Sequence, residues 1–194
     1  MTIEFYQANA DSFFNDTVNV DMQSLYIPFT QALPTNARIL DAGCGSGRDS
    51  KAFLDMGFNV EAFDASSEMV KHATIHTGLN VSLCSFAEFD KSNCYDAIWA
   101  CASLLHVAEN ELPEALASLN RSLKIQGIWY MSFKYGDCQR VKDGRTFTDM
   151  NEERFSALIA QFPELIISQC WLTEDQRSER SDRWLNAIVH KSSV

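Results

Sequence analysis

Apolar residues along this chain occur in two alternating patterns, which together predict its secondary structure. Short apolar runs between polar or turn residues are typical of buried strands, whereas apolar positions three or four apart indicate a helix with one buried face. The predicted strands are residues 38–40, 59–63, 80–84, 95–100, 127–133, 165–172 and 184–189. The predicted helices are residues 48–56, a segment capped by Ser66 that ends before Gly78, a segment with Pro113 in its first turn, and residues 151–162.

The order of these elements predicts the fold class. Strands that alternate with helices favour an α/β fold with a doubly wound, mostly parallel sheet and helices on both faces. The last two predicted strands follow each other without a helix between them, so they predict an antiparallel edge. Residues before the first strand are expected to be helical, and the 194 residues suffice for one domain with a substantial core.

A glycine-rich segment after the first predicted strand is the strongest chemical signal in the chain. Residues 38–49 read R-I-L-D-A-G-C-G-S-G-R-D, with glycines at Gly43, Gly45 and Gly47. Such glycines suit a tight turn from strand to helix in which the backbone approaches a ligand closely. Asp41 precedes the first glycine, and its charge would repel a pyrophosphate bound by loop amides. The segment therefore favours a cofactor with positive charge and no phosphate, such as S-adenosylmethionine.

The glycine spacing and a second acid support this interpretation. The third glycine of a dinucleotide fingerprint would fall at Arg48, and no Gly-Lys-Ser or Gly-Lys-Thr follows to form a P-loop. Asp64 ends the next predicted strand, 21 residues after Gly43, where an acid binds the hydroxyl groups of a ribose. Asp49 lies in the first turn of the predicted helix 48–56, where a negative charge suits the helix dipole.

At these residues the chain resembles the class I S-adenosylmethionine-dependent methyltransferases, and the resemblance covers most of its length. It implies a Rossmann-like seven-stranded sheet, S-adenosylmethionine as the cofactor and S-adenosylhomocysteine as the product. It also implies that Asp41 lies near the methionine moiety, that the glycines lie beneath the cofactor and that Asp64 binds the ribose. Residues 45–49 and 142–149 are in addition similar to small bacterial methyltransferases associated with tellurite resistance. The predicted cofactor-binding residues are Asp41, Gly43, Cys44, Gly45, Arg48, Asp64, Ala65, Phe86, Ala100 and Cys101.

Loops after the later strands supply further candidates, because ligands of such sheets bind at the carboxyl ends of the strands. Phe86 either packs against the adenine or is a core aromatic residue. His106 is the predicted catalytic residue, since a neutral imidazole can accept a proton from a hydroxyl acceptor; the alternative is that it caps local structure. Alignment of the reactants can itself supply much of the catalysis of methyl transfer.

Two regions are predicted to hold the methyl acceptor. The resemblance implies that residues 1–30 form a helical lid, and Tyr6 in this segment is a predicted substrate-binding residue. The loop 134–149 contributes Lys134 and Arg145, and Arg180 adds positive charge near the expected mouth of the site, which would suit an anionic acceptor. Acidic residues alternate with these bases, so a solvated surface of mixed charge is the alternative.

Composition narrows the possible partners. The net charge of −10 disfavours a nucleic-acid substrate, which would need clustered Lys and Arg. The chain starts without a basic region before an apolar stretch and has no apolar run of membrane-spanning length, so we expect a cytoplasmic protein without a membrane contact. His72 and His76 lack the H-E-x-x-H pattern of a zinc site, and we interpret them as surface residues, with no metal predicted.

These observations predict a methyltransferase that uses S-adenosylmethionine to modify a small molecule. A protein that binds S-adenosylmethionine without catalysis, and one that methylates proteins, are open alternatives. A nicotinamide oxidoreductase is disfavoured by Asp41 and Arg48. The sequence specifies neither the acceptor nor the oligomeric state.

Overall fold

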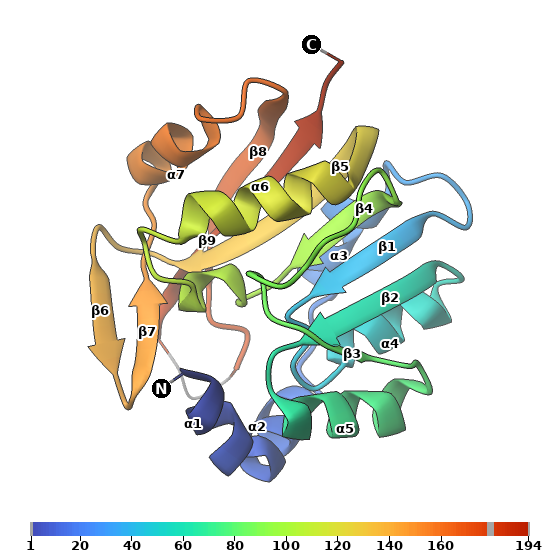
Figure 1. Ribbon diagram of the computed structural model, residues 1–194, viewed down its shortest axis with the longest axis vertical. Coiled ribbons are helices and arrows are strands. Elements are labelled where there is room, and N and C mark those ends of the chain that lie inside the picture. The colour runs from blue at the N-terminus through green and yellow to red at the C-terminus, as the bar shows by residue number, and fades with distance from the viewer. Residues whose placement is uncertain (1, 178–180, 194) are drawn as a thin grey trace.

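A single seven-stranded sheet organises the protein. The computed structural model describes residues 2–177 and 181–193, and its strands follow the order β3-β2-β1-β4-β5-β9-β8 (Figure 1). β9 runs antiparallel to both of its neighbours, and the other adjacent pairs are parallel, which confirms the predicted fold class. The strands of this sheet are β1 (Arg38–Ala42), β2 (Asn59–Asp64), β3 (Ser82–Leu83), β4 (Tyr95–Ala100), β5 (Leu123–Lys134), β8 (Leu165–Glu174) and β9 (Arg183–Lys191).

Helices cover both faces of the sheet and one of its ends. In Figure 1, α6 and α7 lie on the near face, while α3 and α4 lie on the far face. The first two helices lie below the carboxyl ends of the parallel strands, beside α5. The helices are α1 (Thr2–Ala8), α2 (Ala10–Thr17), α3 (Gln23–Thr30), α4 (Arg48–Asp55), α5 (Ser67–Thr77), the 3-10 helix η1 (Leu104–His106), α6 (Leu112–Ser122) and α7 (Glu152–Ile159).

The sheet separates two apolar layers, as the alternation of side chains along a strand requires. On β4, Ile98 packs with the layer of α6 and α7, whereas Trp99 packs with the layer of α3 and α4. Trp99 stacks on Tyr130 with 3.9 Å between ring centroids. Both rings are fully buried, and burying a large apolar side chain contributes about 1.5–3 kcal/mol. This central packing holds the strand ends that carry the site.

Two predicted elements differ from the structure. The predicted strand 80–84 contains only the two residues of β3, because this strand lies at the sheet edge and has one neighbour. The predicted loop 134–149 contains a hairpin of β6 (Gln139–Lys142) and β7 (Arg145–Thr148). Its turn residues Asp143 and Gly144 have φ values of 51° and 72°. Asp-Gly is a common choice for a hairpin turn with two positive φ values, so the signal was present in the sequence.

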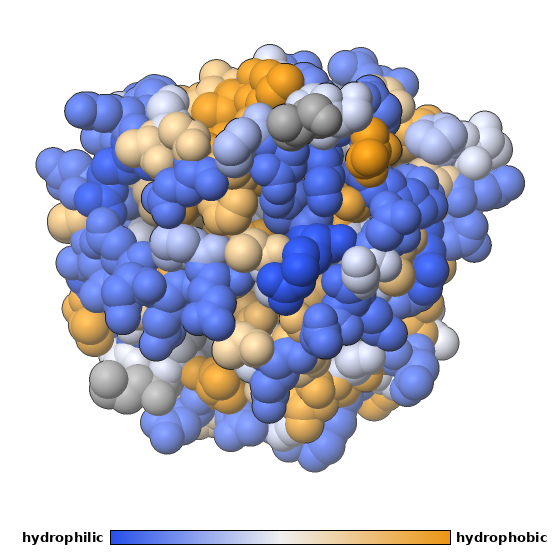
Figure 2. Space-filling model, turned by 45° about the horizontal axis from the view of Figure 1, so that its top comes forward, coloured by the Kyte–Doolittle hydropathy of each residue, from blue (hydrophilic) through white to orange (hydrophobic). Residues whose placement is uncertain are grey.

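The winding of the sheet reverses at β1, whose neighbours β2 and β4 lead away in opposite directions. Ligands of open α/β sheets bind at such a point, outside the carboxyl ends of the strands. Within the described ranges, none of the helices combines the length and apolar character needed to cross a bilayer; the cytoplasmic location stays a prediction. On the face in Figure 2, polar side chains predominate and apolar ones form small separate groups. Arg180, a predicted contributor of charge, lies outside the described residues.

Candidate functional site

A large cavity lies at the reversal point of the sheet. Its volume is about 950 Å³, near the upper end of the roughly 300–1,000 Å³ found for small-molecule sites. The loops after β1, β2, β3 and β4 line it on one side, and α1, α2, the β6–β7 hairpin, β5 and the end of β8 contribute further walls. The cavity therefore has room for a cofactor and a second small molecule.

The glycine loop is held by its own backbone amides. The amides of Gly43 and Cys44 donate to the carbonyl of Phe63 at 3.0 and 2.9 Å, which ties the loop to the end of β2. The Gly45 amide donates to Oδ2 of Asp64 at 2.9 Å. A phosphate-binding loop must leave such amides free for its ligand. The amides of Gly43, Cys44 and Gly45 are therefore used within the protein and are not available to a phosphate.

Gly43 is required by a contact within the protein. Its φ is +75°, and a Cβ at this position would lie 2.6 Å from Cβ of Ser103. We expected the glycines to allow close approach of a ligand, but at Gly43 the close neighbour is the loop after β4. Gly45 faces the first helices instead, since an added Cβ would meet the Phe13 ring at 3.3 Å.

Asp64 lies on the cavity wall at the end of β2. Its Oδ1 accepts a hydrogen bond from the Ser66 amide, and its Oδ2 accepts the one from Gly45, both at 2.9 Å. Burial raises the pKa of this carboxyl group, and the backbone donors oppose that effect. The two amides fix the orientation of a carboxylate whose remaining lone pairs can accept hydrogen bonds from a ligand.

Asp41 occupies a different place from the one predicted. It is 2% exposed and does not line the cavity, and its Oδ2 accepts a hydrogen bond from the Ser50 hydroxyl at 2.6 Å. Burial, together with the negative charge of Asp49, raises the pKa of Asp41 to about 8. A neutral carboxyl behind the loop does not supply the negative charge that we assigned to it. Ala100 was also predicted to bind the cofactor, and it too is buried and does not line the cavity.

Asp49 supplies the negative charge instead. It lines the cavity and accepts hydrogen bonds from the Tyr26 hydroxyl at 2.6 Å and from Nε1 of Trp99 at 2.8 Å. Nε of Arg48 lies 2.6 Å from its Oδ1. Burial alone would raise the pKa of Asp49, but Arg48 and these donors hold it below the usual value. The sequence analysis predicted only that Asp49 interacts favourably with the helix dipole. Arg48 precedes Asp49 in the chain, and this neighbour was the available sign of a buried ion pair.

A histidine and a tyrosine from distant parts of the chain meet across the cavity. The Tyr6 hydroxyl lies 2.7 Å from Nε2 of His106, and Nδ1 of His106 lies 2.8 Å from the Thr146 carbonyl oxygen. Because a carbonyl only accepts, Nδ1 carries the proton, and Nε2 accepts from the tyrosine. Burial lowers the pKa of His106 to about 4, so the ring is neutral at pH 7.

Comparison with known proteins identifies the central part of the chain. Its residues 39–127 match the family described as a methyltransferase domain. The matched residues include the glycine loop, Asp64 and His106. The match supports the predicted methyltransferase class and S-adenosylmethionine as the cofactor; the similarity to tellurite-resistance proteins stays a prediction.

Three related proteins extend the comparison. The YqeM protein of Bacillus subtilis (strain 168), whose name suggests a methyltransferase, is 30% identical over 135 residues. These are 63% of this chain and 53% of YqeM, so the chain spans about half the length of this curated relative. The Burkholderia thailandensis 1,6-didemethyltoxoflavin-N1-methyltransferase superposes with a TM-score of 0.79 at 21% identity. The superposition covers 98% of this chain and 85% of the chain of that enzyme. The [4+2]-cyclase SpnF has a TM-score of 0.77 at 15% identity, with coverage of 98% and 95%. At these identities the two structures show the fold alone.

The structure brings together most of the predicted site residues, including those outside the methyltransferase domain. Lys134 forms an ion pair with Asp182, and the Arg145 guanidinium carbon lies 4.1 Å from the centroid of the Phe5 ring. The predicted site residues that line the cavity are Tyr6, Gly43, Cys44, Gly45, Arg48, Asp64, Ala65, Phe86, Cys101, His106, Lys134 and Arg145.

His72 and His76 are half-buried between helices, not free surface residues as predicted. The Phe14 ring stacks on His72 with 4.9 Å between centroids, and it meets His76 edge-on at 5.7 Å. Nε2 of His72 also lies 2.9 Å from Oδ1 of Asp11. The two histidines therefore fasten α2 to α5 beside the methyltransferase domain's glycine loop.

Proposed function

We propose that this protein transfers a methyl group from S-adenosylmethionine to a small molecule. The observation that carries the proposal is a single cavity that joins the glycine loop and Asp64 to the Tyr6–His106 pair. The toxoflavin methyltransferase of the same fold was crystallised with 1,6-didemethyltoxoflavin and S-adenosylhomocysteine, which supports a small acceptor here as well.

The residues at the glycine-loop end fit S-adenosylmethionine. Bound there, the cofactor would supply an electrophilic methyl group on a cationic sulfur. Asp64 would accept hydrogen bonds from the ribose hydroxyls, and Phe86, which also lines the cavity, would pack against the adenine. Asp49 is charged, but Arg48 pairs with both of its oxygens, so the pair holds this side of the cavity in place and adds no net charge.

The other end of the cavity contains groups that can accept a proton from a methyl acceptor. The neutral ring of His106 presents its Nε2 lone pair to the Tyr6 hydroxyl. A hydroxyl or amine of the acceptor could give its proton to the tyrosine oxygen while the tyrosine proton moves to Nε2. General bases of this kind typically contribute about 10²–10⁴-fold to a rate. We propose His106 as the catalytic base and Tyr6 as the group that connects it to the acceptor.

Enclosure of the cavity favours a small acceptor over a protein. Residues of α1 and α2 line it on one side, and residues of the β6–β7 hairpin line it on another. These elements touch each other, since the Thr146 amide donates to the Thr2 hydroxyl at 3.1 Å. A side chain of a folded protein would have to pass between them. We propose that α1 and α2 act as the lid; α3, the last part of the predicted lid segment, packs on the sheet instead.

Calorimetry with S-adenosylhomocysteine tests the proposal. The wild type should bind, and Asp64→Ala should bind about 10- to 100-fold more weakly, because a hydrogen bond to a charged group contributes about 1.5–3 kcal/mol. The matched control Asp90→Ala removes an exposed acid and should bind like the wild type. A wild type without affinity for this ligand would refute the proposal.

A screen of small hydroxyl and amine acceptors, followed by the release of S-adenosylhomocysteine, tests catalysis. Turnover that His106→Gln reduces about 10²-fold or more would support the proposed base. Tight cofactor binding without turnover of any acceptor would instead favour a binding protein without methyl transfer.

A further inference from the structure

We propose that the methyl acceptor is a small organic anion whose charged group binds Arg145 while its reacting hydroxyl or amine faces the Tyr6–His106 pair. This inference rests on the proposed function, since it concerns the acceptor end of the same cavity. It is carried by a buried guanidinium nitrogen on the cavity wall that has no hydrogen-bond partner among the described residues.

Arg145 is held by aromatic rings. Its guanidinium carbon lies 4.1 Å from the centroid of Phe5 and 5.2 Å from that of Phe147, and its side chain is 17% exposed. Its Nε is buried and has no hydrogen-bond partner among the described residues. Buried polar groups are nearly always hydrogen-bonded in native proteins, so such a donor on a cavity wall points to a ligand.

Two other arginines around the acceptor end are already paired with acids at short range. Nε of Arg140 lies 2.5 Å from Oδ2 of Asp149, and Nη2 of Arg177 lies 2.6 Å from Oδ2 of Asp175. By contrast, Nη2 of Arg145 lies 3.7 Å from Oδ2 of Asp143, whose side chain is 60% exposed. An exposed pair at that distance contributes little. Arg145 therefore keeps its capacity for a ligand, and a guanidinium fork matches a carboxylate or another planar oxyanion.

The position of Arg145 fits this role. The Phe147 ring lies next to both Arg145 and His106. Its centroid is 5.2 Å from the guanidinium carbon of Arg145 and 4.9 Å from the centroid of the His106 ring. Thr146, whose carbonyl oxygen holds Nδ1 of His106, follows Arg145 directly in β7. The charge of Arg145 also acts on Tyr6, where it opposes the rise in pKa that burial causes. An anion on Arg145 therefore lies beside the groups that would take the proton.

Binding of an anion would also make His106 a stronger base. Burial lowers the pKa of His106 most, and the charges of Arg145 and Lys134 lower it further. A ligand anion would offset those charges and raise the pKa toward the working pH, where a general base is most effective. His106 would therefore become an effective base only when the anionic acceptor is bound.

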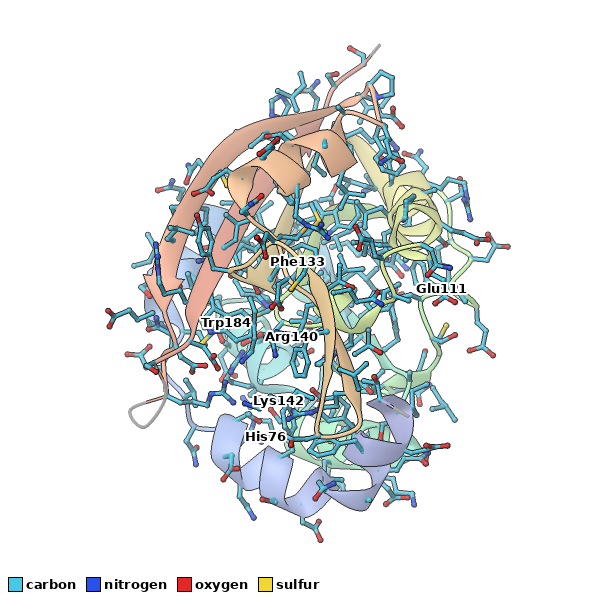
Figure 3. All side chains as sticks on the ribbon, turned by 90° about the vertical axis from the view of Figure 1, so that its left-hand side faces the viewer. His76, Glu111, Phe133, Arg140, Lys142 and Trp184 are labelled. Carbon is cyan, nitrogen blue, oxygen red and sulfur yellow. The ribbon has the colours of Figure 1, made fainter. Side chains whose placement is uncertain are left out.

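Acidic residues also line the cavity, both at its exposed rim and on its buried wall. Glu111 is exposed at the start of α6, and Figure 3 shows it well apart from Lys142 of the hairpin. Exposed charges more than about 8–10 Å away are largely screened at physiological salt.

The buried acids Asp49 and Asp175 are already paired with arginines. Asp64 is the buried acid whose charge acts on Tyr6, where it raises the pKa of the hydroxyl. The charge of Arg145 acts on Tyr6 more strongly and in the opposite direction. Positive charge therefore dominates at the Tyr6 hydroxyl.

Matched pairs of probes test the inference on protein saturated with S-adenosylhomocysteine. Calorimetry would compare benzoate, salicylate and 4-hydroxybenzoate with benzamide, salicylamide and 4-hydroxybenzamide, which replace the carboxylate by a neutral amide. We expect at least one carboxylate to bind about 10-fold or more tightly than its amide. Arg145→Gln should remove that preference and leave affinity for S-adenosylhomocysteine unchanged.

Two further variants keep the test decisive. Arg145→Lys retains the charge without the fork and should retain part of the preference. Arg121→Gln, an equal loss of charge at an exposed position of α6, should retain all of it. Equal affinity for carboxylates and amides, binding of no carboxylate, or a preference that persists in Arg145→Gln would overturn the inference. Loss of S-adenosylhomocysteine binding in the wild type would instead overturn the proposed function.

Discussion

The two ends of the cavity are built in opposite ways. At the glycine-loop end, buried acids accept hydrogen bonds from donors of the protein. The Gly45 amide donates to Asp64, and the Tyr26 hydroxyl donates to Asp49. At the acceptor end, the key contact joins Tyr6 and His106, which are 100 residues apart, and Arg145 keeps a buried donor without a partner. The first end is held in shape by these bonds, and Asp64 keeps lone pairs that can accept hydrogen bonds from a ligand. The second end leaves a positively charged donor for a ligand.

This difference explains why one fold can keep a cofactor while its acceptors vary. The loop after β1 takes its shape from contacts within and between β1, β2 and β4, so changes there disturb the fold. The acceptor end consists of side chains on α1 and on a hairpin whose strands form a separate two-stranded sheet. Side chains in those elements can change without disturbing the sheet, because function resides in sites added to a fold.

The largest effect should follow from removing a buried charge at the glycine-loop end. Asp49→Ala would leave Arg48, Tyr26 and Trp99 without their shared acceptor. Breaking a buried ion pair by removing one partner costs about 3–5 kcal/mol. We expect a loss of this size in the free energy of unfolding, measured by urea denaturation.

Asp55→Ala is the matched control for that experiment. Asp55 lies in the same helix, pairs with Lys51 and has a side chain that is 63% exposed. An exposed pair of this kind contributes about 0–1 kcal/mol. Similar losses in the two variants would show that Asp49 is not the buried centre of this end.

The next effect concerns the acceptor end and depends on pH. Burial lowers the pKa of His106 from its ordinary 6.5 to about 4 in the folded protein. Between these values the unfolded chain binds a proton that the folded protein does not, so the wild type loses stability as the pH falls through this window. The loss amounts to about 3 kcal/mol by pH 4. Because Asp41 and other acids also titrate in both proteins, the measurement is the difference in stability between wild type and His106→Gln, which should change by about this amount from pH 7 to 4.

His190→Gln serves as the control because His190 is half-buried on β9, where its Nδ1 contacts the Ser168 hydroxyl. This variant should follow the pH dependence of the wild type. If His106→Gln followed it equally, His106 would not be buried as a neutral ring, and the proposed tautomer would lose its basis.

Sequence alone predicted the succession of strands and helices in residues 39–127 and the glycine loop as the candidate cofactor region, because those signals are local. Gly43, Gly45 and Asp64 lie within one strand–helix–strand unit, and their roles depend on neighbours in that unit. The Asp-Gly signal of the hairpin at Asp143 was equally local, although we predicted a loop there.

What the sequence could not give depends on long-range burial. Asp41 and Asp49 both stand near the glycines, and only the three-dimensional environment decides which carboxyl is charged. Ser50 donates to the first, whereas Arg48 and Trp99 stabilise the second. Pairing across distant segments, such as that of α1 with the hairpin, has no periodic signal in the chain. The sequence therefore indicated the cofactor chemistry but misplaced the charge that accompanies it.

The smallest effect compares two glycines, one from each end. Gly43 and Gly144 have nearly equal φ values of +75° and +72°, so alanine at either position incurs the same backbone cost, about 1–2 kcal/mol. At Gly144 a new Cβ meets nothing within 4 Å, whereas at Gly43 it would lie 2.6 Å from Cβ of Ser103. Overpacking typically costs a further 1–3 kcal/mol, roughly. We therefore expect Gly43→Ala to destabilise the protein more than Gly144→Ala by about that difference in urea denaturation. Equal losses would mean that the loop after β1 can yield, and that the glycine-loop end is less rigid than its hydrogen bonds imply.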